Sequence, residues 1–184
     1  MRARILLLPL LAIFLCSVVC SAESFLQAGI APDFGGIIDG KFFRLYKHRD
    51  KVVFVDFFSI LGTDIADLYE REYLPCQTCI EHLRILEQLY EELKGSVLIV
   101  AVSVDFKREW VERVVRENRL SFPIIYDPGR RIMEHYEVKA MPTSFLIKGL
   151  YIKGIAKGAR SRECYLQGIF GVLEEGNVKY GLGH

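Results

Sequence analysis

Two uninterrupted apolar runs mark the middle of the chain. Residues 52–58 (VVFVDFF) and 97–104 (VLIVAVSV) are rich in β-branched and aromatic side chains. Such runs are typical of strands buried on both faces, which belong to parallel sheets covered by helices. Between the runs, apolar side chains recur at helical spacing, namely Cys79, Leu83, Leu86, Tyr90 and Leu93. A long amphipathic helix is therefore predicted to begin near Cys76, which gives a strand–helix–strand unit.

The alternation of apolar runs continues on both sides of this unit. Upstream, residues 23–30 are predicted to be a linker, and Asp39-Gly40 between two apolar runs predicts a hairpin over 34–45. Downstream, the predicted elements are a helix over 107–118, a strand over 122–126, a helical stretch over 127–136, an antiparallel pair over 144–148 and 151–156, and a helix over 161–173 capped by Ser161. The pattern predicts one α/β domain with a central mixed β-sheet flanked by helices.

The first 22 residues differ from the rest of the chain. Arg2 and Arg4 precede an uncharged stretch that ends in Cys20-Ser21-Ala22, which is typical of a secretory signal cleaved after Ala22. An uncleaved membrane anchor is the alternative, since about 18 uncharged residues lie at the lower limit for crossing a bilayer. Lipid attachment at Cys20 fits less well.

Either interpretation predicts an exported, extracytoplasmic domain, in the periplasm or at a surface facing the outer membrane. The predicted parts are a signal peptide or N-terminal membrane anchor over 1–22, a folded domain over 23–175, and a glycine-rich flexible tail over 176–184.

Charge and cysteine count narrow the classes of function. Of the 24 Lys and Arg residues two lie in the leader, and the 22 that remain nearly balance 23 Asp and Glu residues. The sequence has no basic stripe of the kind found in nucleic-acid-binding proteins, so nucleic acid is not expected as a partner. Outside the leader the cysteines are Cys76, Cys79 and Cys164, an odd number that suits a disulfide framework poorly. The C-x-x-C spacing of the first two indicates redox or metal chemistry, and Cys164 is predicted to be a small buried side chain of the last helix.

The segment Cys76-Gln77-Thr78-Cys79 is suited to dithiol chemistry. Cys76 falls at the predicted helix start, where free N–H groups and the helix dipole favour a thiolate. Cys79 shares a helical face with Leu83 and Leu86 and is expected to be buried. Cys76 should then be the attacking nucleophile, and Cys79 the resolving thiol that releases the mixed disulfide.

A metal site is the alternative use of the cysteine pair. Zinc takes four ligands, and only His82 is near in sequence, with no fourth ligand in view. A c-type haem needs His directly after the second cysteine, where this chain has Ile80. The histidines are scattered and match no metal or catalytic constellation: His48, His82, His135 and His184. We therefore expect redox chemistry with no metal and no cofactor.

Several motifs occur in an order that is more specific than C-x-x-C alone. They are Ala31-Pro32-Asp33-Phe34, 51–58, 100–105 (VAVSVD), Phe122-Pro123, Asp127-Pro128-Gly129 and 141–147 (MPTSFLI). In these motifs the chain resembles the TlpA/ResA group of membrane-associated thioredoxin-like proteins, over about residues 31–173. The resemblance implies a thioredoxin fold and an extracytoplasmic thiol–disulfide oxidoreductase that reduces protein disulfides. Its partners would be disulfide-containing or thiol proteins and a membrane thiol-electron donor, and we expect a monomer.

The resemblance also implies roles for three further residues. Pro142 matches the cis-proline of the family, which faces the cysteine pair, and such a turn exposes the backbone of Met141 for pairing with an extended substrate. Asp56 matches the buried aspartate of thioredoxins that shuttles a proton for the resolving thiol. The alternative for Asp56 is a carboxylate at a strand edge that reaches water or a helix N-terminus.

The chain departs from the family just before the cysteines. Asp56 and Cys76 are 20 positions apart, whereas relatives join this strand to the first cysteine by a much shorter segment. The additional residues 60–74 are predicted to contain a short helix that Asp64 caps and Pro75 ends. This insert would act either as a lid that selects substrates or as surface decoration.

Two other functions occur on similar folds. A peroxiredoxin-like peroxidase would need Thr or Ser three residues before its reactive cysteine, where this chain has Tyr73. A Sco-like copper-binding module would need C-x-x-x-C spacing and a distant His, whereas Cys76 and Cys79 are separated by two residues. Both functions remain alternatives to a dithiol enzyme.

Overall fold

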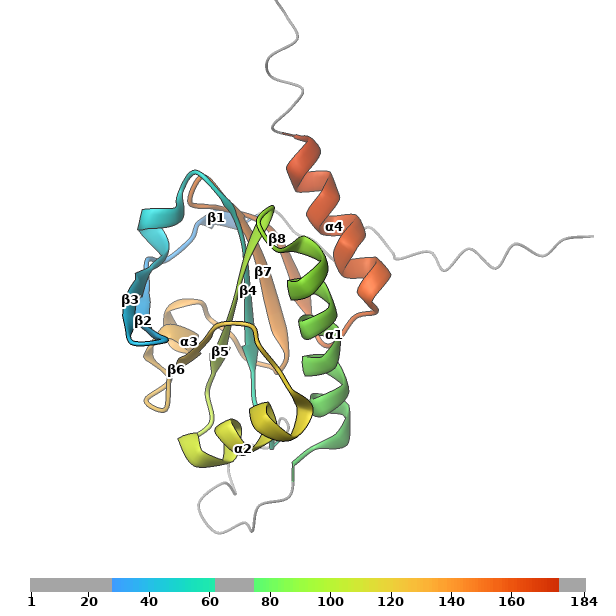
Figure 1. Ribbon diagram of the computed structural model, residues 1–184. Helices are drawn as coiled ribbons and strands as arrows, with labels where there is room; N and C mark the ends of the chain where they lie inside the picture. Colours follow the sequence, from blue (N-terminus) through green and yellow to red (C-terminus); the bar gives the residue numbers. More distant parts are fainter. Residues whose placement is uncertain (1–27, 62–74, 176–184) are drawn as a thin grey trace, which may run out of the picture.

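The computed structural model describes residues 28–61 and 75–175, and Figure 1 shows their arrangement. Four predictions fall wholly or mostly outside the described residues: the leader over 1–22, the linker over 23–30 except its last three residues, the helix within the 60–74 insert, and the tail over 176–184. None of the helices described is long and apolar enough to cross a membrane.

A six-stranded mixed sheet forms the centre of the domain, in the order β1-β8-β7-β4-β5-β6. Its strands are β1 (Ala28–Ile30), β4 (Val52–Phe58), β5 (Val97–Ser103), β6 (Ile124–Tyr126), β7 (Thr143–Lys148) and β8 (Tyr151–Lys157). β4 runs parallel to β5 and antiparallel to β7, and every residue of β4 is buried. The two apolar runs of the sequence are thus adjacent inner strands, and the predicted mixed sheet of a thioredoxin fold is confirmed.

Of the four α-helices in the described part of the chain, three cover one face of the sheet (Figure 1). The helices are α1 (Gln77–Leu93), α2 (Arg108–Asn118), α3 (Arg131–His135) and α4 (Arg162–Glu174). Leu86 of α1, Val111 of α2 and Ile169 of α4 are fully buried in one apolar core against the sheet. Helix α4 begins after Ser161, whose hydroxyl oxygen accepts a hydrogen bond from the Cys164 N–H, as predicted. The side chain of Cys164 is buried, also as predicted.

The opposite face carries α3 and a hairpin of strands β2 (Gly35–Ile38) and β3 (Lys41–Arg44), followed by the 3-10 helix η2 (Leu45–His48). Asp39 and Gly40 both have positive φ, 49° and 76°, which the tightest hairpin turns require. Phe34 and Phe43 anchor the hairpin: the rings of Phe34 and Tyr136 lie 5.7 Å apart in an edge contact. The predicted hairpin is confirmed.

The prediction of a linker over 23–30 is wrong for its last three residues. They form β1, which pairs antiparallel with β8 at the edge of the sheet. Backbone pairing holds this strand, and the side chain of Ile30 is 70% exposed. A strand of three residues is too short to show an alternation of apolar and polar positions, so its sequence carried no signal.

The contact between the hairpin and the sheet can be tested at Gly36. A Cβ atom at this position would lie 2.5 Å from Cγ2 of Ile125, a buried residue of β6. We therefore expect Gly36→Ala to lower the free energy of unfolding by about 1–3 kcal/mol, as overpacking does. Gly29→Ala is the matched control because its Cβ would meet nothing within 4 Å. Urea denaturation followed by circular dichroism would measure both variants, and equal stability of the two would contradict this packing.

Candidate active site

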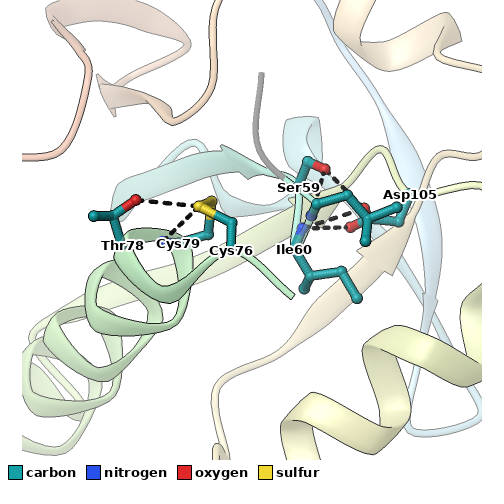
Figure 2. The surroundings of a disulfide bond; sticks show 7 residues. Ser59, Ile60, Cys76, Thr78, Cys79 and Asp105 are labelled. Atoms are coloured by element: carbon teal, nitrogen blue, oxygen red, sulfur yellow. Dashed lines mark hydrogen bonds between the residues drawn. A yellow bond between two sulfur atoms is a disulfide. The ribbon is translucent and has the colours of Figure 1, made fainter. Parts of the chain in front are cut away.

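The two cysteines of the C-x-x-C segment are joined at the tip of α1 (Figure 2). Their Cα atoms lie 5.2 Å apart, and the pair forms a disulfide. Cys76 is the N-cap of the helix, and its sulfur accepts a hydrogen bond from the backbone N–H of Cys79 at 3.3 Å. The Thr78 hydroxyl lies 3.1 Å from the same sulfur. The predicted helix start at Cys76 is confirmed.

The prediction that Cys79 is buried is wrong for this disulfide form. Both cysteines are partly exposed. Cys79 lies in the first turn of α1, at the end of the sheet, and continuous burial along the helix begins only near Ile80 and Leu83. The helical face that carries Cys79 is therefore buried further along the helix, at Leu83 and Leu86, but partly exposed at the N-terminal end where Cys79 lies.

A buried carboxylate behind the cysteines holds the chain in place (Figure 2). The backbone N–H of Cys76 donates to the carbonyl oxygen of Ile60 at 2.7 Å. The N–H of Ile60 and the hydroxyl of Ser59 in turn donate to the Asp105 carboxylate, at 3.1 Å and 2.8 Å, and Ser103 donates to it at 2.9 Å. Burial raises the pKa of the Asp105 carboxyl above its ordinary value, while these hydrogen bonds oppose the rise. Asp105 thus ties the ends of β4 and β5 to the turn that holds Cys76.

Asp56 lies in the middle of the sheet and is fully buried. Its neighbours on the two adjacent strands are Ala101 and Ser144. The Ser144 hydroxyl donates to Oδ1 of Asp56 at 2.6 Å, and Nε2 of His82 lies 3.0 Å from Oδ2. The alternative of a carboxylate at a strand edge is therefore wrong, because β4 is an inner strand and the carboxylate has protein partners on both oxygens.

His82 corrects the prediction that no histidine belongs to a constellation. It is 2% exposed and pairs with Asp56 from helix α1. Tyr165 of α4 completes the cluster: its hydroxyl lies 3.3 Å from Oγ of Ser144, and its ring centroid lies 6.1 Å from that of His82. Burial is the main cause that raises the pKa of the Tyr165 phenol well above its ordinary value, and the charge of Asp56 raises it further. This hydroxyl therefore stays neutral near pH 7.

The Met141–Pro142 turn lies at the same end of the sheet as the cysteines. Its peptide bond is cis, as expected, and the Pro142 carbonyl accepts a hydrogen bond from the Gly158 N–H at 2.8 Å. The next residue, Thr143, pairs with Phe57 near the carboxyl end of β4. The backbone N–H of Cys76 is hydrogen-bonded to Ile60, just beyond the same end. The turn and the disulfide therefore flank one strand end.

Comparison with known proteins agrees with this geometry. A family model described as the AhpC/TSA family matches residues 29–152. The thiol–disulfide oxidoreductase ResA of Geobacillus thermodenitrificans is 32% identical over 135 residues, which cover 72% of this chain and 70% of the relative. This chain belongs to the AhpC/TSA family and is a thiol–disulfide oxidoreductase of the ResA type. ResA of Bacillus subtilis is 26% identical, covering 71% of this chain and 66% of that protein.

Solved structures support the fold of this ResA-type enzyme. A Chlorobium tepidum protein described as thiol:disulfide interchange protein DsbE is 25% identical with a TM-score of 0.67, covering 82% of this chain and 99% of that one. StoA of Bacillus subtilis has the same fold, with a TM-score of 0.61 at 20% identity over 77% of this chain and 98% of that one.

Sequence reasoning found the cysteines, Asp56 and the Pro142 turn of the ResA-type enzyme but missed four residues around them: His82, Ser144, Tyr165 and Asp105. A usable signal existed for His82, because it is three residues after Cys79 on the apolar face of the helix. A polar residue on a buried helical face and Asp56 inside a buried strand need partners, and each can supply the other. For Ser144 and Tyr165 the sequence held no comparable sign. Among the described residues, no group of three or more His, Cys, Asp and Glu side chains is placed to hold a metal ion.

The hydrogen bonds to Asp105 predict a large effect of its removal. Asp105→Ala would leave the Ile60 N–H and two buried serine hydroxyls without their acceptor. Each buried donor left unpaired costs about 1–3 kcal/mol, so with three such donors we expect the free energy of unfolding to fall by at least about 3 kcal/mol. Asp50→Ala, at an exposed position, should change it by less than about 0.5 kcal/mol. Denaturant unfolding of both variants measures the difference, and a loss as small as that of Asp50→Ala would show that Asp105 does not hold this turn.

Proposed function

We propose that this enzyme reduces disulfides of exported proteins outside the cytoplasm, with Cys76 as nucleophile and Cys79 as resolving thiol. The carrying observation is the position of Cys76 as N-cap of a 17-residue helix, with its sulfur accepting the Cys79 N–H. An N-terminal helix end favours negative charge, and a hydrogen bond to sulfur favours the thiolate further. Cys79 has no such place, since it lies inside the first turn.

The reaction transfers two electrons to the substrate in two exchanges. The Cys76 thiolate attacks one sulfur of a substrate disulfide, forms a mixed disulfide and releases the other sulfur as a thiolate. Cys79 then attacks the Cys76 sulfur, which breaks the mixed disulfide, releases the second substrate thiol and forms the Cys76–Cys79 disulfide. A thiol donor must reduce that disulfide again, and the resemblance to membrane-associated relatives favours a donor in the membrane.

The substrate segment would lie along the Met141–Pro142 turn. This turn and Cys76 flank the carboxyl end of β4, so an extended chain paired with the backbone of Met141 would present its disulfide to the Cys76 sulfur. Asp56 is fully buried, and a carboxylate in the core is stabilised by a proton or a cation nearby. It would therefore assist the removal of the Cys79 proton. The uncharged leader with Arg2 and Arg4 supports export.

The assignment of the two cysteines can be tested by alkylation and by substitution. In the reduced protein Cys76 should react first with iodoacetamide, because its thiolate is the stabilised one. Cys76→Ser should abolish disulfide exchange, whereas Cys79→Ser should accumulate mixed disulfides that mass spectrometry detects. Faster labelling of Cys79 than of Cys76 would reverse the two roles.

The proposed direction predicts the redox potential of the pair. A reductase should have a potential near that of thioredoxin, about −270 mV, and far from the oxidant DsbA at about −120 mV. Gln77 and Thr78 carry no charge that would shift the balance strongly towards the dithiol. Equilibration of Cys76 and Cys79 with glutathione buffers, read by mass after alkylation, gives the value. A potential close to that of DsbA would mean that the enzyme oxidises its partners.

A further inference from the structure

The imidazole of His82 has one nitrogen engaged and one without a partner. Nε2 lies 3.0 Å from Oδ2 of Asp56. Nδ1 is buried and has no hydrogen-bond partner among the described residues. Buried polar atoms are nearly always hydrogen-bonded, and each exception calls for an explanation such as a catalytic role. Nδ1 of His82 therefore marks a group that the Asp56 pair alone does not explain.

The position of His82 on α1 indicates which group this nitrogen serves. Side chains of a helix lean towards its N-terminus and cover the turn before their own Cα. Cys79 is three residues earlier, so it occupies that turn on the same helical face. Asp56 engages Nε2 from the sheet, so Nδ1 is the nitrogen left for a second partner.

We infer that His82 accepts the proton of Cys79 at Nδ1 and that Asp56 is the counter-charge for the imidazolium so formed. This inference rests on the proposed roles of Cys76 and Cys79. The Cys79 thiol passes its proton to Nδ1, while the Nε2–H stays bonded to the Asp56 carboxylate. The Cys79 thiolate attacks the Cys76 sulfur, the bond from Cys76 to the substrate sulfur breaks, and its electron pair leaves on the substrate. The substrate thiolate takes up the proton that His82 held, which restores the neutral ring.

The groups around the ring are consistent with this transfer. From the sheet, Asp56 and the neutral hydroxyl of Ser144 lie in the cluster. Tyr165 of α4 also lies in the cluster and stays neutral near pH 7. The nearby charge of Arg160 lowers the Tyr165 pKa, but burial outweighs it. An imidazolium formed on this ring would lie 3.0 Å from Oδ2 of Asp56, which would be its counter-charge. His82 touches the reacting thiol in this scheme, and Asp56 acts through His82 as a positioning residue.

His82→Gln tests the inference because glutamine can still donate to Asp56 but cannot take a proton near pH 7. General bases contribute about 10²–10⁴ in rate, so we expect the resolving step, measured in single turnover from a preformed Cys76 mixed disulfide, to slow at least tenfold at pH 7. The step should recover as the pH rises towards the ordinary range of a thiol. The alkylation rate of Cys76 should stay unchanged. His135→Gln, at an exposed position of α3, is the matched control and should resolve at the parent rate.

The outcomes separate this inference from the proposed function. A His82→Gln variant with the parent rate and pH profile of the resolving step would overturn the relay while the cysteine roles stood. Exchange that survives in Cys76→Ser would overturn the proposed function whatever His82 does.

A second measurement covers a variant that fails to fold. In the reduced parent protein, the 15N chemical shift of His82 Nδ1 should depend on the Cys79 thiol and change in Cys79→Ser. Identical Nδ1 chemical shifts would show that His82 only compensates the charge of Asp56.

Discussion

The buried pair of Asp56 and His82 is the constraint on which the arrangement of the site depends. A carboxylate in the middle of a sheet has lost its water and needs partners from the protein. Here those partners come from α1 and β7, and Tyr165 of α4 closes the cluster. Removing one partner of such a buried pair lowers stability more than replacing both partners does. Because His82 is on α1 and Asp56 is on β4, their contact also constrains the rotation of α1 against β4. That rotation decides where the cysteines lie.

Local patterns predicted much of this fold, because burial on both faces and helical spacing can be recognised in short windows. The strand around Asp56 and the helix after Cys76 are of this kind, and the Asp39-Gly40 hairpin turn is another. The partners within the site could not be predicted in that way. Asp56 and His82 are 26 residues apart, and Asp56 and Ser144 are 88 apart, so only the strand order brings them together.

Two buried carboxylates, Asp105 and Asp56, stabilise different parts of the site. Asp105 binds backbone and hydroxyl donors at the ends of β4 and β5 and thereby fixes the turn at Ile60. Asp56, within β4, accepts hydrogen bonds from side chains and positions helix α1 through His82. One carboxylate thus sets the position of the Cys76 backbone, and the other sets the surroundings of the thiol chemistry. Both carboxylates lie outside the C-x-x-C segment, in the motifs 51–58 and 100–105 that also carry the family resemblance.

The lengths of the two outer strands limit how the sheet can pair with other chains. In the described sheet, β1 and β6 are the edges, and each is only three residues long. A long open edge invites other extended chains to add to it, which is a common route to aggregation. Short edges offer few free backbone groups for such growth. The two ends of the six-stranded sheet therefore give other extended chains little backbone to pair with.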